Sequence, residues 1–133
     1  MKPGKSRVKS TMARQPERTI QTPSGDLLVR IALVFLGVPY KGETLDGGSR
    51  EKLVVRLDAF DCTTFVETVL ASALDITTGG TDGSGLAAHL KRIRYRGGKI
   101  SGYASRLHYF SDWLADNEKK KILKDVSRLL GGR

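Results

Sequence analysis

The sequence predicts a single α+β domain that follows a basic N-terminal arm. Apolar residues recur at helical spacing in several stretches, which is typical of helices packed on a core. The run Leu53–Leu57 has the composition of a short strand, and Gly97-Gly98 is typical of a hairpin turn. A chain of 133 residues is long enough to bury one core and too short for two domains of ordinary size. We therefore expect one domain over residues 23–133.

Residues 1–22 are predicted to form a disordered basic arm, because they are polar and contain little to bury. They hold six lysines and arginines against one acidic residue, and so carry more than half of the formal net charge of +9. Such a charge favours polyanions, for example nucleic acid or an acidic wall polymer. Because most of the charge lies in the arm, it gives little support to a basic binding face on the domain.

The composition also argues against several classes of protein. The arm has no apolar run of about 7–15 residues after its basic start, so it is not a complete secretory signal. The longest apolar stretch, Leu27–Leu36, is shorter than the roughly 20 residues that a membrane span needs. A single cysteine excludes an intramolecular disulfide and a cysteine-rich zinc site. These features predict a soluble cytoplasmic chain.

The first predicted helix follows the arm. Ser24 is a good N-cap for a helix that continues to Leu36, and Gly37 and Pro39 are expected to end it. Apolar residues on almost every side of this helix predict that it lies at the centre of the core. Residues 41–50 have the composition of a loop.

The second half of the domain is predicted to be mainly helical. An apolar stripe predicts a helix from about Cys62 to Ile76. The remaining expected elements are, in order, a flexible turn over residues 77–85, a helix over Leu86–Ile93, the hairpin-like turn at Gly97-Gly98, a helix that begins at Asp112 behind Ser111, and an amphipathic stripe from Ile122 to Leu130.

Cys62 is the candidate nucleophile. Asp61 is a good N-cap, and it would place the thiol in the first turn of a helix, where free N–H groups and the positive end of the dipole favour a thiolate. Two features oppose this interpretation. The negative charge of Asp61 disfavours a thiolate, and Thr64 with Glu67 forms an alternative capping box that would start the helix after Cys62. A lone cysteine is also often a small buried apolar residue.

His108 is the better of two candidate bases, because it lies among aromatic and basic residues that are typical of a cleft wall. The other histidine, His89, is expected to face solvent, and the alternative for His108 is a hydrogen-bonded structural role. Tyr40 follows Gly37-x-Pro39 and could donate to a developing oxyanion, or its ring could simply pack. Arg106 is a candidate for binding acidic groups of a substrate, against the alternative of a solvated residue.

Three stretches occur in order at compatible spacing: Phe35–Tyr40 (FLGVPY), Leu57–Glu67 (LDAFDCTTFVE) and Ile93–Trp113 (IRYRGGKISGYASRLHYFSDW). In these motifs the chain resembles the bacterial N-acetylmuramoyl-L-alanine amidase-like family, one of the papain-like cell-wall cysteine amidases and peptidases of the NlpC type. The resemblance extends from about residue 27 to about residue 129.

The resemblance implies a role for each candidate residue. Cys62 matches the nucleophile, His108 the general base, Tyr40 the tyrosine of the site, and Asp61 the acidic residue beside the nucleophile. It also implies a papain-like α+β fold that needs no metal or cofactor. Members extend into further strands, so the domain is expected to be incomplete on its C-terminal side. Members usually carry an export signal, which implies a periplasmic or secreted location, in conflict with the cytoplasmic one predicted from the N-terminus.

Three hypotheses follow. The first is a cysteine amidase that cuts the amide between N-acetylmuramic acid and L-alanine in peptidoglycan fragments. The second is a catalytically inactive, truncated domain that binds wall fragments or, through its basic arm, nucleic acid. The third is a remnant without activity, in which an uncovered sheet edge promotes self-association.

Overall fold

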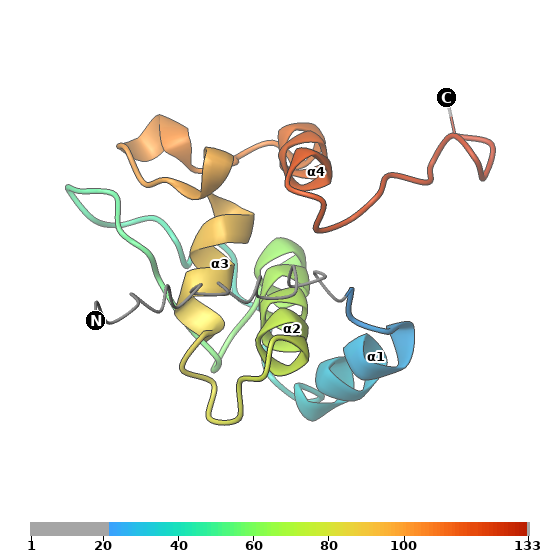
Figure 1. Ribbon diagram of the computed structural model, residues 1–133. Helices are drawn as coiled ribbons and strands as arrows, with labels where there is room; N and C mark the ends of the chain where they lie inside the picture. The colour runs from blue at the N-terminus through green and yellow to red at the C-terminus, as the bar shows by residue number, and fades with distance from the viewer. Residues whose placement is uncertain (1–21, 133) are drawn as a thin grey trace, which may run out of the picture.

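A computed structural model describes residues 22–132, and the predicted basic arm lies almost wholly outside them. The longest helix, α2, packs against α1 on one side and α3 on the other, and α4 lies beyond the far end of α3 (Figure 1). The elements in chain order are α1 (Gly25–Val34), α2 (Cys62–Thr77), α3 (Leu86–Arg94), the short 3-10 helices η1 (Arg96–Gly98) and η2 (Tyr103–Ser105), and α4 (Phe110–Lys119).

The expected papain-like α+β fold is wrong for the part of the chain that is described, because residues 22–132 contain no β-sheet. Their strand-like pairing is limited to two isolated bridges, Tyr40 with Phe60 and Tyr95 with Arg106. The predicted uncovered sheet edge is therefore also missing from these residues, and with it the expected route to self-association.

Side chains explain why the predicted strand at Leu53–Leu57 does not pair. A strand must have its backbone polar groups hydrogen-bonded by a neighbour. Here the guanidinium of Arg94 donates from Nη1 to the carbonyl of Val54 at 2.6 Å. This side-chain donor occupies a carbonyl that a second strand would otherwise have used.

The predicted hairpin at Gly97-Gly98 is replaced by η1. Both glycines have positive φ, 58° and 71°, which suits a tight turn. The turn does bring the two flanking segments together, since the amide of Leu107 donates to the carbonyl of Arg94 at 2.9 Å. The pairing does not continue into a ladder, so the glycine pair marks a turn but not a hairpin.

The core lies on the inner faces of α2, α3 and α4, and not on α1 as the sequence predicted. Ser24 does cap α1, as expected, by accepting the amide of Leu27. However, α1 has no buried residue, and Val29 and Val34 are 59% and 78% exposed. The buried apolar cluster comes instead from α2 onward: Ala71, Leu74, Leu90, Ile93, Leu107, Trp113 and Ile122.

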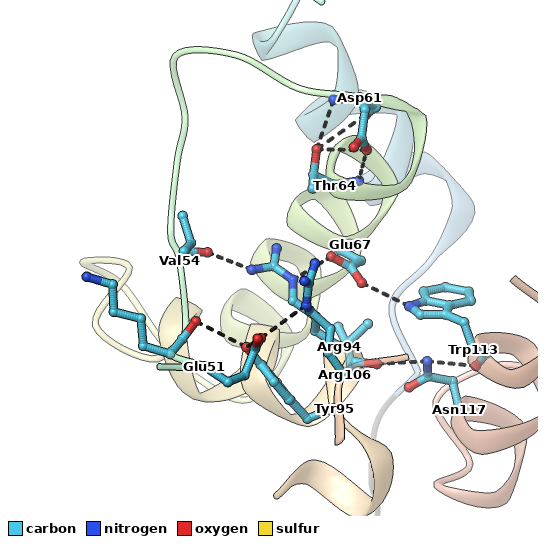
Figure 2. Close-up of polar contacts among 12 residues, drawn as sticks. Glu51, Val54, Asp61, Thr64, Glu67, Arg94, Tyr95, Arg106, Trp113 and Asn117 are labelled. Atoms are coloured by element: carbon cyan, nitrogen blue, oxygen red, sulfur yellow. Dashed lines mark hydrogen bonds and ion pairs between the residues drawn. The ribbon is translucent and has the colours of Figure 1, made fainter. Parts of the chain in front are cut away.

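A buried polar cluster joins the elements around α2 (Figure 2). Glu67 on α2 accepts from Arg94 Nε at 2.8 Å and from Trp113 Nε1 at 3.1 Å. All three residues are at most 3% exposed. Burial raises the pKa of Glu67, and the bonds from Arg94 and Trp113 oppose that rise. A carboxylate in this position is tolerated because both of its oxygens are hydrogen-bonded.

We predict that Glu67→Ala destabilises the fold strongly. The substitution leaves the guanidinium of Arg94 buried without its counter-charge, and breaking a buried ion pair from one side costs about 3–5 kcal/mol. Urea unfolding followed by circular dichroism measures the change. Asp112→Asn, at an exposed pair with Arg96, is the matched control and should change stability little. Equal effects of the two substitutions would contradict the structural role of Glu67.

Candidate functional site

Cys62 is the first residue of α2, as the Asp61 interpretation predicted. Asp61 has extended backbone geometry and accepts the amide of Thr64 on Oδ1 at 2.8 Å, while the hydroxyl of Thr64 accepts the amide of Asp61 at 3.0 Å. This reciprocal pair is a capping box. The alternative box with Glu67 does not form, because Glu67 faces the core. Cys62 is exposed, so it is not the small buried residue of the alternative interpretation.

A hollow of about 360 Å³ lies in front of the thiol, and we call it the Cys62 hollow. It brings together three of the predicted site residues, Tyr40, Asp61 and Cys62. The rest of its wall is almost entirely apolar: Ala32, Phe35, Leu36, Gly37, Val38, Phe60 and Phe65.

Backbone hydrogen bonds place Tyr40 beside the head of α2. The amide of Lys41 donates to the carbonyl of Phe60 at 2.9 Å, and the amide of Phe60 donates to the carbonyl of Pro39 at 3.1 Å. Phe35 packs edge-on against Phe60 with ring centroids 5.1 Å apart. The segment after α1 therefore runs alongside the residues that precede Cys62, which explains why the Gly-x-Pro-Tyr and Asp-Cys motifs meet.

His108 lies outside the Cys62 hollow. It precedes α4, is exposed, and its Nε2 lies 2.8 Å from the carbonyl oxygen of Tyr103. Since a carbonyl only accepts, Nε2 carries the proton of the neutral ring and Nδ1 is left as the acceptor. The ring also packs on that of Tyr103, with centroids 4.1 Å apart. The structure orients the imidazole but does not place it against the thiol.

Arg106 lines a second hollow of about 360 Å³, which we call the Arg106 hollow. The Arg106 side chain is 9% exposed, and its guanidinium forms ion pairs with Asp46 at 2.5 Å and with Glu51 at 3.1 Å. Burial lowers the pKa of Arg106, but the two carboxylates outweigh that effect and the net shift is upward. The other lining residues are Leu45, Gly47, Gly48, Arg50, Lys52, Val54 and Tyr103.

Sequence reasoning missed the acidic partners of Arg106. Asp46 lies in the loop over residues 41–50, which has no regular structure, and Glu51 follows it directly. Both are about 60 residues from Arg106 along the chain. Tyr95 was also missed. Its hydroxyl donates to Glu51 at 2.7 Å. Burial, as the larger cause, and this hydrogen bond together raise the pKa of Tyr95 to about 12. The composition of the loop carried no signal for these contacts.

The described residues were also searched for metal-binding groups and for membrane-spanning helices. Within residues 22–132, no group of three or more histidine, cysteine, aspartate or glutamate side chains is arranged to hold a metal ion. No helix in the same part of the chain is long and apolar enough to cross a membrane.

The site has an exposed cysteine at the head of a helix, facing a hollow. This arrangement is that of a domain with a reactive thiol, and comparison with known proteins identifies its family. Residues 30–133 match the family model described as N-acetylmuramoyl-L-alanine amidase-like. The chain therefore belongs to this family. A search of curated proteins finds no match.

Solved structures agree with this assignment. An N-acetylmuramoyl-L-alanine amidase from Bacteroides uniformis is 40% identical over 77% of this chain, with a TM-score of 0.70. A Bacteroides fragilis protein provisionally described as a xylanase is 45% identical over 75% of this chain, with a TM-score of 0.69. A protein from Legionella pneumophila is 32% identical over 77%, with a TM-score of 0.63. The chain spans 43%, 43% and 34% of these three structures, respectively.

We predict that Asp61→Asn and Asp61→Ala separate the capping role of Asp61 from the effect of its charge. Asparagine keeps the cap, so it should change stability little, whereas alanine should cost about 1 kcal/mol. Both remove a negative charge beside Cys62, so the rate of iodoacetamide alkylation at neutral pH should rise in both variants. Urea unfolding and alkylation kinetics measure the two effects. A slower reaction in Asp61→Asn would show that the carboxylate assists the thiol.

Proposed function

We propose that this chain carries the nucleophile and part of the substrate site of a cysteine amidase that cuts the bond between N-acetylmuramic acid and L-alanine. The observation that carries the proposal is the exposed thiol of Cys62 at the first turn of α2, facing the Cys62 hollow. Family membership and the amidase from Bacteroides uniformis support the substrate class. Because the chain spans less than half of these structures, the activity of the whole domain is part of the proposal.

The chemistry follows from the residue types. A base removes the proton of Cys62, and the thiolate attacks the amide carbon to form a tetrahedral oxyanion. Free N–H groups at the head of α2, with the hydroxyl of Tyr40, stabilise that oxyanion. The amine leaves with a proton from the base, and water then hydrolyses the thioester to release the muramic carboxylate. The reaction needs no redox partner.

We assign the base to His108, with the backbone carbonyl of Tyr103 as the group that orients it. The bond from Nε2 to Tyr103 leaves Nδ1 free to accept the thiol proton. This role requires His108 and Cys62 to approach one another when substrate binds, because His108 does not line the Cys62 hollow. A binding role for His108 is the alternative, and kinetics separate the two.

Glycoside cleavage is less compatible with the site. A glycosidase needs two carboxyl groups that flank one sugar bond, one of them protonated. The carboxyl group that lines the Cys62 hollow is that of Asp61, and it is engaged as the cap of α2. Xylan is therefore a suitable negative control substrate for the chain.

We predict that the full chain releases the peptide from a muramoyl peptide and that Cys62→Ala abolishes this release while substrate still binds. Mass spectrometry of the products locates the cut, and calorimetry measures binding. Cys62→Ser, which is nearly isosteric, is the matched control for packing and should also be inactive. Binding without turnover by the unmodified chain would favour the inactive binding domain, and turnover by Cys62→Ala would exclude the thiol mechanism.

We predict that His108→Ala lowers kcat by about 10²–10⁴-fold, the usual contribution of a general base, with a smaller change in KM. Alkylation of Cys62 in the absence of substrate should change little in the same variant, because His108 does not line the Cys62 hollow in the free chain. His89→Ala is the control, since the ring of His89 lies 3.5 Å from the hydroxyl of Thr78, at the end of α2 opposite Cys62. A raised KM with unchanged kcat would assign His108 to substrate binding instead.

A further inference from the structure

The Arg106 hollow has the composition of a site for a charged ligand. Its volume of about 360 Å³ is within the range of small-molecule sites, and five of its lining residues are charged. Three of these are basic, Arg50, Lys52 and Arg106, and two are acidic, Asp46 and Glu51. The excess of one positive charge favours an anionic ligand group.

The two carboxylates that contact Arg106 are held very differently. The side chain of Glu51 is 9% exposed and also accepts the hydroxyl of Tyr95, so it is fixed in the wall. The side chain of Asp46 is 54% exposed and bonds to Arg106 alone. An incoming carboxylate can therefore replace Asp46 without disturbing Glu51.

The guanidinium of Arg106 has donors to spare. Its Nη2 donates to Asp46, and its Nε lies 3.1 Å from Glu51 Oε1 as an ion pair without a hydrogen bond. Nη1 makes no hydrogen bond within residues 22–132. The Tyr103 ring, 5.3 Å from the guanidinium carbon, covers one face of the group and helps to fix its plane. Displacement of Asp46 would leave Nη1 and Nη2 as a fork that matches the two oxygens of a carboxylate.

We propose that the Arg106 hollow binds a carboxylate of the substrate peptide, and that Asp46 is the built-in counterion which this carboxylate displaces. The inference rests on the proposed function for the identity of the peptide. Arg50 and Lys52, both exposed on the same hollow, add attraction for the anion. Tyr103 forms a wall of the hollow and also packs on His108, so the bound carboxylate lies next to the assigned base.

The test measures binding of a muramoyl peptide with free carboxylates to the full chain carrying Cys62→Ala, so that no turnover interferes. Adding Asp46→Asn should tighten binding at least about threefold, because the competing carboxylate is gone. Replacing Arg50 and Lys52 together by alanine should weaken binding. Arg106→Gln should weaken it about tenfold or more, as expected when a charge-assisted hydrogen bond is lost.

A second ligand tests whether the carboxylates of the peptide are the groups that the Arg106 hollow recognises. The same peptide with its carboxylates amidated should bind more weakly to the Cys62→Ala chain, and Asp46→Asn should not improve its binding. Asp112→Asn, which removes an exposed carboxylate paired with Arg96 outside the hollow, is the matched control and should leave affinity unchanged.

The outcomes separate this proposal from the proposed function. Unchanged or weaker binding in Asp46→Asn, equal affinity for the amidated peptide, or no binding of the peptide would overturn the carboxylate site, even if the unmodified chain were an active amidase. Conversely, an inactive chain that shows the predicted affinity changes would keep the site and lose the catalytic proposal. If Arg106→Gln fails to fold, Asp46→Asn and the Arg50, Lys52 double variant still decide the outcome.

Discussion

The buried hydrogen bonds of Glu67 are the constraint on which the rest of the structure depends. This carboxylate joins α2 to Arg94 at the end of α3 and to Trp113 in α4, and Arg94 in turn binds the carbonyl of Val54. A buried charge is stable only with its partners in place, so the cluster sets how these three helices and the extended segment pack together. It also fixes the inner face of α2, and this leaves the first turn of that helix, with Cys62, directed outward.

The predicted site residues fall into two groups. Tyr40, Asp61 and Cys62 meet at the Cys62 hollow, which is mainly apolar, while Arg106 lies in a second hollow in which half of the lining residues are charged. His108 is connected to the second group through Tyr103, by a hydrogen bond and by ring packing. A substrate with an amide at one point and a carboxylate at another suits this division, since an apolar wall around a thiol and a guanidinium fork recognise different chemical groups.

Among the predictions that rested on local interactions, the caps of α1 and α2 were confirmed, whereas Ser111 does not cap α4, which begins at Phe110 behind Tyr109. Ser24 and Asp61 cap α1 and α2 as expected, because a cap depends on residues within one turn. The strand at Leu53–Leu57 failed because the Arg94 side chain, 40 residues away, binds the carbonyl of Val54. The central position expected for α1 failed because periodicity shows which residues are apolar but not which helix will cover them.

The sequence by itself determined where α1 and α2 begin, the turn at Gly97-Gly98, the position of Cys62 at a helix head, and, through its motifs, the family. These features depend on residue type and short spacing, which are visible in one dimension. Only the tertiary structure decided that Glu67 is a buried anchor and not a cap, that Arg106 is buried and paired with Asp46 and Glu51, and that His108 lies apart from the Cys62 hollow. Each of these depends on contacts across many residues, where the balance between desolvation and pairing decides whether a charged side chain is buried.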